Sequence, residues 1–266
     1  MKFTFDHDLH IHSFISSCSK DPEQTSENIL KYAKENNLKT ICLANHFWDE
    51  TIEGASPWYE KQNFAHISAA RPLPQDENVR FLFGCEAEVD RNLTLALSPE
   101  KYDEFDFIVI PTTHFHMAIA LFDEQKKSAE ALAQAWIDKF DAVMNMDLPF
   151  HKVGLAHLTC DLMARHGFSL KEILDEIPEN ELKRLFTKAS TLGIGIEINA
   201  GDFENEENIS NSFLHLYKTA KSCGCKFYFG SDSHSVAQLN EAKKRLTKAV
   251  DLLDLKESDK FDFTKL

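Results

Sequence analysis

Seven short apolar segments recur along the chain, and stretches with helical periodicity separate most of them. The segments are residues 3–12, 39–46, 80–89, 106–110, 152–157, 194–199 and 226–234. Apolar segments of strand length that alternate with helical stretches are typical of parallel strands joined by crossover helices. Seven of them in one chain predict an α/β fold whose sheet closes into a barrel.

The stretches between the strands carry start and stop signals of helices. Thr25 or Ser26 can cap the first helix, because apolar residues follow at helical spacing. Gly193 is the predicted stop of a later helix. Residues 47–78 show no such pattern, and a loop of this length often forms a lid or a substrate wall. Further helices are predicted over residues 128–146, 169–177, 179–192 and 209–221.

Length and composition predict one globular domain that spans residues 1–266. The chain is 43% hydrophobic, enough to bury a large core, and no Pro/Gly-rich or low-complexity segment suggests a boundary. The first residues lack the apolar core of a signal peptide, and no apolar run reaches membrane-spanning length. The six cysteines are scattered, which is typical of reduced thiols. We therefore predict a cytoplasmic protein that does not associate with a membrane.

The formal net charge of −14 argues against a stable nucleic-acid partner, because such a partner requires Lys and Arg clustered along a surface. A cleft that holds several divalent cations would still form a positive spot on this acidic surface. That spot could attract a small phosphorylated substrate. No pattern in the sequence specifies an oligomeric state.

Polar residues gather where the predicted strands end. They are His10 and His12, His46, Glu86, His114, His157, Asn199, and Asp232 with His234. In β/α barrels the carboxyl ends of the strands meet at one mouth, where the chemistry takes place. A single histidine at a strand end is usually an ordinary polar residue, but several imidazoles and two carboxylates at one mouth favour a metal site.

The strand ends form a series of motifs, namely Asp8-Leu9-His10-Ile11-His12, Ala44-Asn45-His46, Gly84-Cys85-Glu86, Asp106 through His114, Leu155-Ala156-His157 and Gly230-Ser231-Asp232-Ser233-His234. In order and spacing this series resembles the polymerase-and-histidinol-phosphatase (PHP) domain family, over essentially the whole chain. The resemblance implies a distorted seven-stranded (β/α)7 barrel, similar to a TIM barrel. It also implies a free-standing, metal-dependent phosphoesterase.

The resemblance further implies a cluster of two or three divalent metal ions at the barrel mouth. The implied ligands are His10, His12, Glu86 and Asp232 for the first metal, a bridging Glu86 with His114 and His157 for the second, and His46 with His234 for the third. These nitrogen and oxygen donors suit Zn, Mn or Fe and do not select among them.

Positions beside these motifs leave alternatives open. The family often has Asp in place of Asn45, whose amide could orient His46 but would polarise it less than a carboxylate. The loop after the first strand offers Cys18 or Asp21 as a further ligand of the third metal, although Asp21 also fits a turn. Asp8 is expected to share a face with the first two histidines and to fix an imidazole by a hydrogen bond.

The leading functional hypothesis is hydrolysis of a small phosphomonoester, as in a histidinol phosphatase, by a metal-bound hydroxide. Glu86, Asp232 and His234 are the candidate catalytic residues. A nuclease or nucleotide phosphodiesterase is an alternative that the acidic charge disfavours. A metal-binding module without turnover is another, but such a module need not keep eight donors aligned. An amidohydrolase-type barrel would explain the His-x-His pair, but it fits the later motifs less well.

Overall fold

The computed structural model describes residues 1–266, with the exception of the side chain of Lys265. Seven parallel strands form one sheet in which each strand pairs with its neighbour in the sequence. The strands are β1 (His7–Ile11), β2 (Thr40–Phe47), β3 (Arg80–Ala87), β4 (Ile108–Pro111), β5 (Val153–Ala156), β6 (Gly195–Asn199) and β7 (Lys226–Gly230).

The last strand returns to the first and nearly closes the sheet. Just beyond β7, the amide of Asp232 donates to the carbonyl oxygen of His10 (2.7 Å), and the amide of His12 donates to that of Ser233 (3.1 Å). The predicted (β/α)7 barrel is therefore confirmed. This closure joins β1 and β7 at the carboxyl ends of the strands, where the candidate site residues lie.

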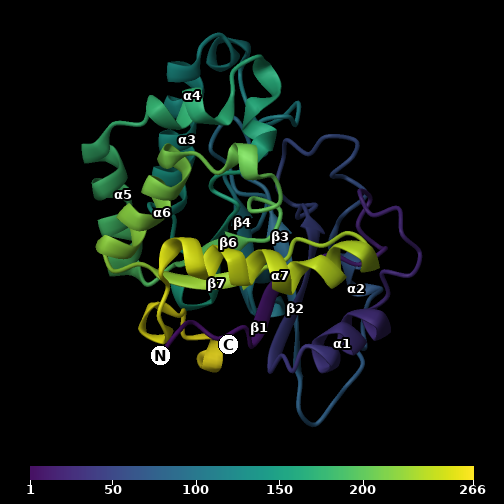
Figure 1. Cartoon of the computed structure of the whole chain (residues 1–266). Helices are drawn as coiled ribbons and strands as arrows, with labels where there is room; N and C mark the ends of the chain where they lie inside the picture. Colours follow the sequence, from purple (N-terminus) through teal and green to yellow (C-terminus); the bar gives the residue numbers. More distant parts are fainter.

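Helices surround the sheet on its outer side, and α7 runs across the strands β7 and β1 (Figure 1). The α-helices are α1 (Ser26–Glu35), α2 (Phe64–Ser68), α3 (Ala129–Val143), α4 (Leu170–Asp175), α5 (Glu179–Leu192), α6 (Asn211–Ser222) and α7 (Val236–Leu253). Short 3-10 helices lie at Pro99–Glu104, Asp123–Lys126, Phe150–Lys152, Asp161–His166, Glu206–Asn208, Glu257–Asp259 and Phe263–Lys265.

Two of the predicted helix signals are confirmed. The hydroxyl oxygen of Thr25 accepts a hydrogen bond from the amide of Asn28 (3.3 Å) and caps α1. Gly193 ends α5 with a left-handed φ of 76°. The sequence analysis did not predict α7, which Ser235 caps. The strand expected up to residue 234 ends earlier, at Gly230.

The first strand and the long loop also differ from expectation. The strand begins at His7, because the amide of Phe3 instead donates to the carbonyl oxygen of Leu255 (3.2 Å). Residues 47–78 contain the short helix α2. In this segment Trp48 and Tyr59 pack in a separate apolar cluster with Ala96, between β3 and β4, and with Ile119, after β4. The segment is therefore a packed wall beside the barrel mouth.

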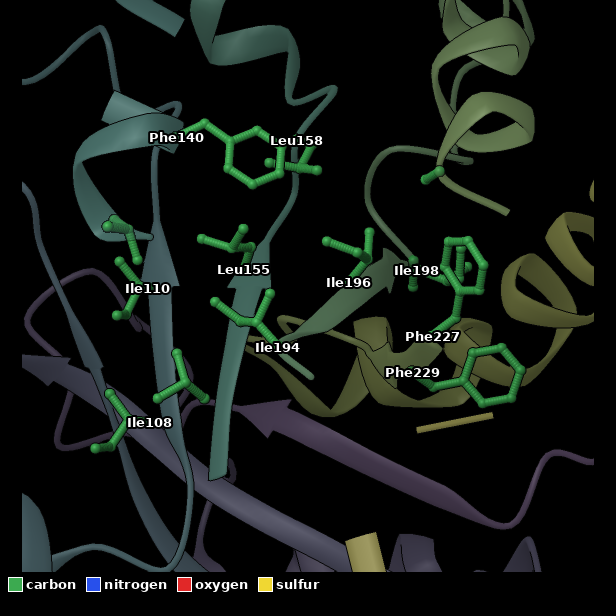
Figure 2. Packing of buried hydrophobic residues seen from close by; sticks show 14 of the residues in the cluster. Ile108, Ile110, Phe140, Leu155, Leu158, Ile194, Ile196, Ile198, Phe227 and Phe229 are labelled. Carbon is green, nitrogen blue, oxygen red and sulfur yellow. The ribbon is translucent and has the colours of Figure 1, made fainter. Parts of the chain in front are cut away.

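The main core lies between the sheet and the helices. Figure 2 shows part of this layer, with Ile108 and Ile110 on β4, Leu155 on β5 and Phe140 on α3. Side chains that alternate with these along the strands fill the barrel interior instead. This inner cluster consists of Leu9, Cys42, Ala44, Leu82, Phe107, Val109, Ala156, Tyr228, Phe261 and Phe263.

Gly154 on β5 makes room for the largest side chain of this inner cluster. A Cβ atom at Gly154 would lie 2.4 Å from Cε1 of Tyr228, which is far inside van der Waals contact. The six cysteines are free. Among the described residues, no helix has both the length and the apolar character required to cross a membrane.

Candidate metal centre

The Glu86 carboxylate lies at the centre of the predicted site. Its two oxygens lie 2.6–3.7 Å from ring nitrogens of five histidines, and these are His10, His12, His46, His114 and His157. The remaining two predicted residues are adjacent. Asp232 Oδ1 lies 3.1 Å from Nε2 of His12, and the His234 ring stacks on the His12 ring with centroids 4.2 Å apart. The structure thus brings all eight predicted residues together.

Three groups of residues could each hold a metal ion, because within each group the ligand atoms lie within 4.8 Å of one another. The groups are His10, His12 and Glu86; Glu86, His114 and His157; and His12, His46 and His234. The first two groups follow the predicted first and second sites, and Asp232 Oδ1 lies beside the first group, 3.6 Å from Nε2 of His10. The third group adds His12 to the predicted pair. His12 and Glu86 therefore each face two groups.

Hydrogen bonds fix most of the imidazoles so that their Nε2 atoms remain available. In five of the six histidines, Nδ1 donates to an acceptor at 2.8–3.0 Å, which leaves Nε2 unprotonated in the neutral ring. The acceptors are Glu197 for His10, Ser16 for His12, Glu88 for His114, Thr113 for His157 and the backbone oxygen of Asp232 for His234. This is the arrangement in which histidines bind metals.

The prediction for Asp8 is wrong because β1 contains an irregularity. Asp8 pairs with Ile41 but Ile11 pairs with Leu43, so one extra residue stands in β1 between the two pairs. Such a bulge shifts the faces to which later side chains point. The Asp8 carboxylate accepts hydrogen bonds from the Ser231 amide (2.9 Å) and the Tyr32 hydroxyl (3.2 Å), and it contacts no imidazole among the described residues.

The carboxylate that orients His10 is Glu197 on β6, which the sequence analysis missed. Its Oε1 accepts from Nδ1 of His10 at 2.8 Å, and its Oε2 accepts from the backbone amide of His157 at 2.8 Å. Gly230 permits this approach, because a Cβ atom there would lie 1.9 Å from Glu197 Oε1. One signal was present in the sequence: a single acidic residue in an otherwise apolar strand requires a buried polar partner.

The positions that were left open occupy other roles. Asn45 Oδ1 accepts from the Ser16 hydroxyl (3.0 Å), so it supports His12 through that serine and does not contact the His46 ring. Burial raises the pKa of the Cys18 thiol to about 12, and its sulfur belongs to none of the three groups. Asp21 forms the predicted turn, with one oxygen accepting from the amide of Glu23 (2.9 Å).

Two buried atoms at the centre lack hydrogen bonds in the described structure. Nδ1 of His46 and Oε2 of Glu86 lie 2.6 Å apart, but neither has the geometry of a hydrogen bond to any group. Burial alone would raise the pKa of Glu86, but the imidazoles of His46 and His10 outweigh burial and hold that pKa well below its usual range. An ionised carboxylate ringed by imidazole nitrogens fits one or more divalent cations.

The backbone at two of these strand ends is unusual. His157 and Asp232 have φ angles of 33° and 52°, in the left-handed region that few residues other than glycine adopt readily. Both turn the chain sharply at the end of a strand. Their side chains face the centre as a result.

A cavity of about 530 Å³ adjoins the centre. His157, Asp232 and His234 line this cavity together with Asp202 and Arg245. The volume is in the range of sites for small molecules. The arrangement can therefore hold cations at one side and a small ligand beside them.

Fold and site together define a β/α barrel with a candidate metal centre at its mouth. No protein-family model matches the chain, and a search of curated protein sequences found no match. Among solved structures, the chain is similar to a histidinol phosphate phosphatase from Lactococcus lactis subsp. lactis in complex with zinc, L-histidinol and phosphate. The TM-score is 0.51 at 16% identity, over 92% of this chain and 93% of that one.

A candidate histidinol phosphatase from Listeria monocytogenes is also similar, with a TM-score of 0.66 at 13% identity over 90% of this chain and 98% of that one. The resemblance predicted from the motifs is thus confirmed at the level of the fold: the chain shares its fold with these two proteins.

Proposed function

We propose that this chain is a metal-dependent phosphoesterase that hydrolyses a small phosphomonoester. The supporting observation is the orientation of the histidines: five are held through Nδ1, and four of these place Nε2 3.2–3.7 Å from a Glu86 oxygen. The fold likeness to a phosphatase solved with zinc, L-histidinol and phosphate supports the same choice. Two or three ions of Zn, Mn or Fe are the expected cofactors.

Bound divalent ions would supply Lewis-acid chemistry, which activates water and offsets the charge that develops on a phosphoryl group. Glu86 would hold two of the ions, because its Oε2 faces His10 and His12 whereas its Oε1 faces His114 and His157. Asp232 would complete the first site beside His12. The Nδ1 atom of His234 donates to the Asp232 backbone oxygen, which leaves the unprotonated Nε2 available to hold a third ion.

The direct test combines elemental analysis with hydrolysis of two model esters. The purified protein should contain Zn, Mn or Fe, and it should hydrolyse p-nitrophenyl phosphate faster than bis-p-nitrophenyl phosphate. Glu86→Gln should lose bound metal and turnover together, because it removes the charge at the centre. The exposed Glu53 provides a control, since Glu53→Gln removes the same charge from the surface.

Other results would point to other functions. Faster cleavage of the diester would favour a phosphodiesterase. Bound metal without hydrolysis of a broad panel of phosphate esters would favour a non-catalytic metal-binding module. Full activity in a Glu86→Gln variant that holds no metal would refute the proposal.

A further inference from the structure

The cavity beside the candidate metal centre carries two oppositely charged residues on its wall. Arg245 comes from α7, and Asp202 comes from the loop that follows β6. His157, Asp232 and His234, which belong to the metal centre, line the same cavity. A phosphate ester bound at the centre would therefore place its leaving group beside these two charges.

Arg245 uses only part of its hydrogen-bonding capacity within the protein. Its side chain is 19% exposed, and among the described residues its single hydrogen bond runs from Nη2 to Glu204 Oε1 (2.6 Å). The Nε and Nη1 donors of the planar guanidinium remain free of protein acceptors. A guanidinium with free donors in a cavity wall suits a carboxylate, which can accept two parallel hydrogen bonds.

Asp202 is a buried carboxyl group with one free oxygen, and burial raises its pKa to about 7. The residue is 7% exposed, and its Oδ2 accepts from the Thr159 hydroxyl (2.7 Å) and the Tyr217 hydroxyl (3.3 Å). Among the described residues, no hydrogen bond reaches Oδ1. The other carboxylates of this part of the wall differ, because Asp161 is exposed and Glu204 already pairs with Arg245. A cationic group beside the free oxygen would favour the ionised form of Asp202, so this carboxyl is the buried acceptor for such a group.

We propose that the cavity selects a phosphomonoester whose leaving group is a zwitterion, with a carboxylate for Arg245 and an ammonium group for Asp202. An O-phosphorylated hydroxy amino acid has this chemistry. The proposal rests on the proposed phosphoesterase function and narrows its substrate class. Hydrolysis would break the ester P–O bond, join the oxygen of water to phosphorus and transfer one proton of water to the leaving oxygen, giving inorganic phosphate and the free hydroxy amino acid.

Four esters separate the two charges in a factorial design. O-phosphoserine carries both groups, phosphoethanolamine carries the ammonium alone, phosphoglycolate carries the carboxylate alone, and p-nitrophenyl phosphate carries neither. The metal-loaded enzyme should show its highest kcat/KM with O-phosphoserine. Removal of either charge from the ester should lower kcat/KM about ten- to hundredfold, the range for a hydrogen bond to a charged group.

Each of two variants removes one charge from the cavity wall. Arg245→Gln should lower the ratio of kcat/KM for O-phosphoserine to that for phosphoethanolamine, because only the former has a carboxylate. Asp202→Asn should lower the ratio of O-phosphoserine to phosphoglycolate. Lys248→Gln is the matched control: Lys248 lies on the same helix and pairs with Glu206 of the same loop (2.9 Å), but it does not line the cavity. This control should leave both ratios unchanged.

Different results would refute the zwitterion proposal and the proposed phosphoesterase function. If p-nitrophenyl phosphate is hydrolysed but phosphoethanolamine is preferred over O-phosphoserine, or if Arg245→Gln changes neither ratio, the zwitterion proposal is wrong and the phosphoesterase stands. If none of the four esters is hydrolysed by protein that contains metal, the proposed function itself is wrong.

Discussion

Among single residues, Glu197 supports two of the candidate ligands at once, because one carboxylate holds both the His10 ring and the His157 backbone. We expect Glu197→Gln to lower metal affinity about ten- to hundredfold, since the neutral amide orients and polarises His10 less well. Competition with a chelator measures this affinity. The exposed Glu207 lies in the loop after the same strand, so Glu207→Gln serves as the control. Equal affinity in the two variants would contradict the role of Glu197.

The residues that could be predicted are those whose position follows from the barrel alone. The ends of parallel strands meet at one mouth, so His46, Glu86 and His157 were predictable from where their apolar segments stop. Glu197 was missed because it stands within a strand, between two isoleucines. Arg245 was missed because it lies on α7, a helix that the sequence analysis did not predict.

Among the elements, β1 shows the limit of reasoning from periodicity. A strict alternation places Asp8 on the face of the two histidines, but one extra residue before Ile11 shifts the pattern. A bulge of this kind depends on the partner strands and leaves no trace in apolar periodicity. Strand identity was therefore predictable along the whole sheet, whereas the facing of a side chain in β1 was not.

The pairing of a glycine with a tyrosine inside the barrel gives a prediction about β5 and β7. Gly154→Ala should reduce the free energy of unfolding by about 1–3 kcal/mol, because the new methyl group would overlap the Tyr228 ring. Urea denaturation monitors the change. The cost should shrink in a Tyr228→Leu background, since the ring is gone. Additive effects of the two substitutions would show that the ring is not the cause.

For the whole molecule, His7 links the first strand to the last. Its Nδ1 donates to Asp6 (2.8 Å), its Nε2 accepts from the Phe229 amide (2.9 Å), and its ring lies 4.4 Å from that of Phe263 near the chain end. Burial lowers the pKa of His7 below its usual value. Protonation would remove the acceptor for the Phe229 amide.

This link predicts a dependence of stability on pH. The pKa of a free histidine is about 6.5. Below this pH His7 binds a proton in the unfolded chain but not in the folded chain, so the free energy of unfolding falls as the pH is lowered toward the folded pKa. His7→Gln should reduce the slope by up to about 1.4 kcal/mol per pH unit. Urea denaturation from pH 5 to 8 tests this, with His151→Gln at the surface as control. An unchanged slope in His7→Gln would contradict the prediction.

The left-handed backbone of His157 and Asp232 lowers the stability of the fold, while the side chains at these positions face the candidate metal centre. A side chain in that region costs roughly 1–2 kcal/mol relative to glycine. Glycine at either position would relax the chain and at the same time withdraw an imidazole or a carboxylate from the centre. Selection for thermal tolerance alone would therefore favour glycine at these two turns, and the most heat-resistant descendants of this barrel should include ones that lack a side chain of the candidate metal centre.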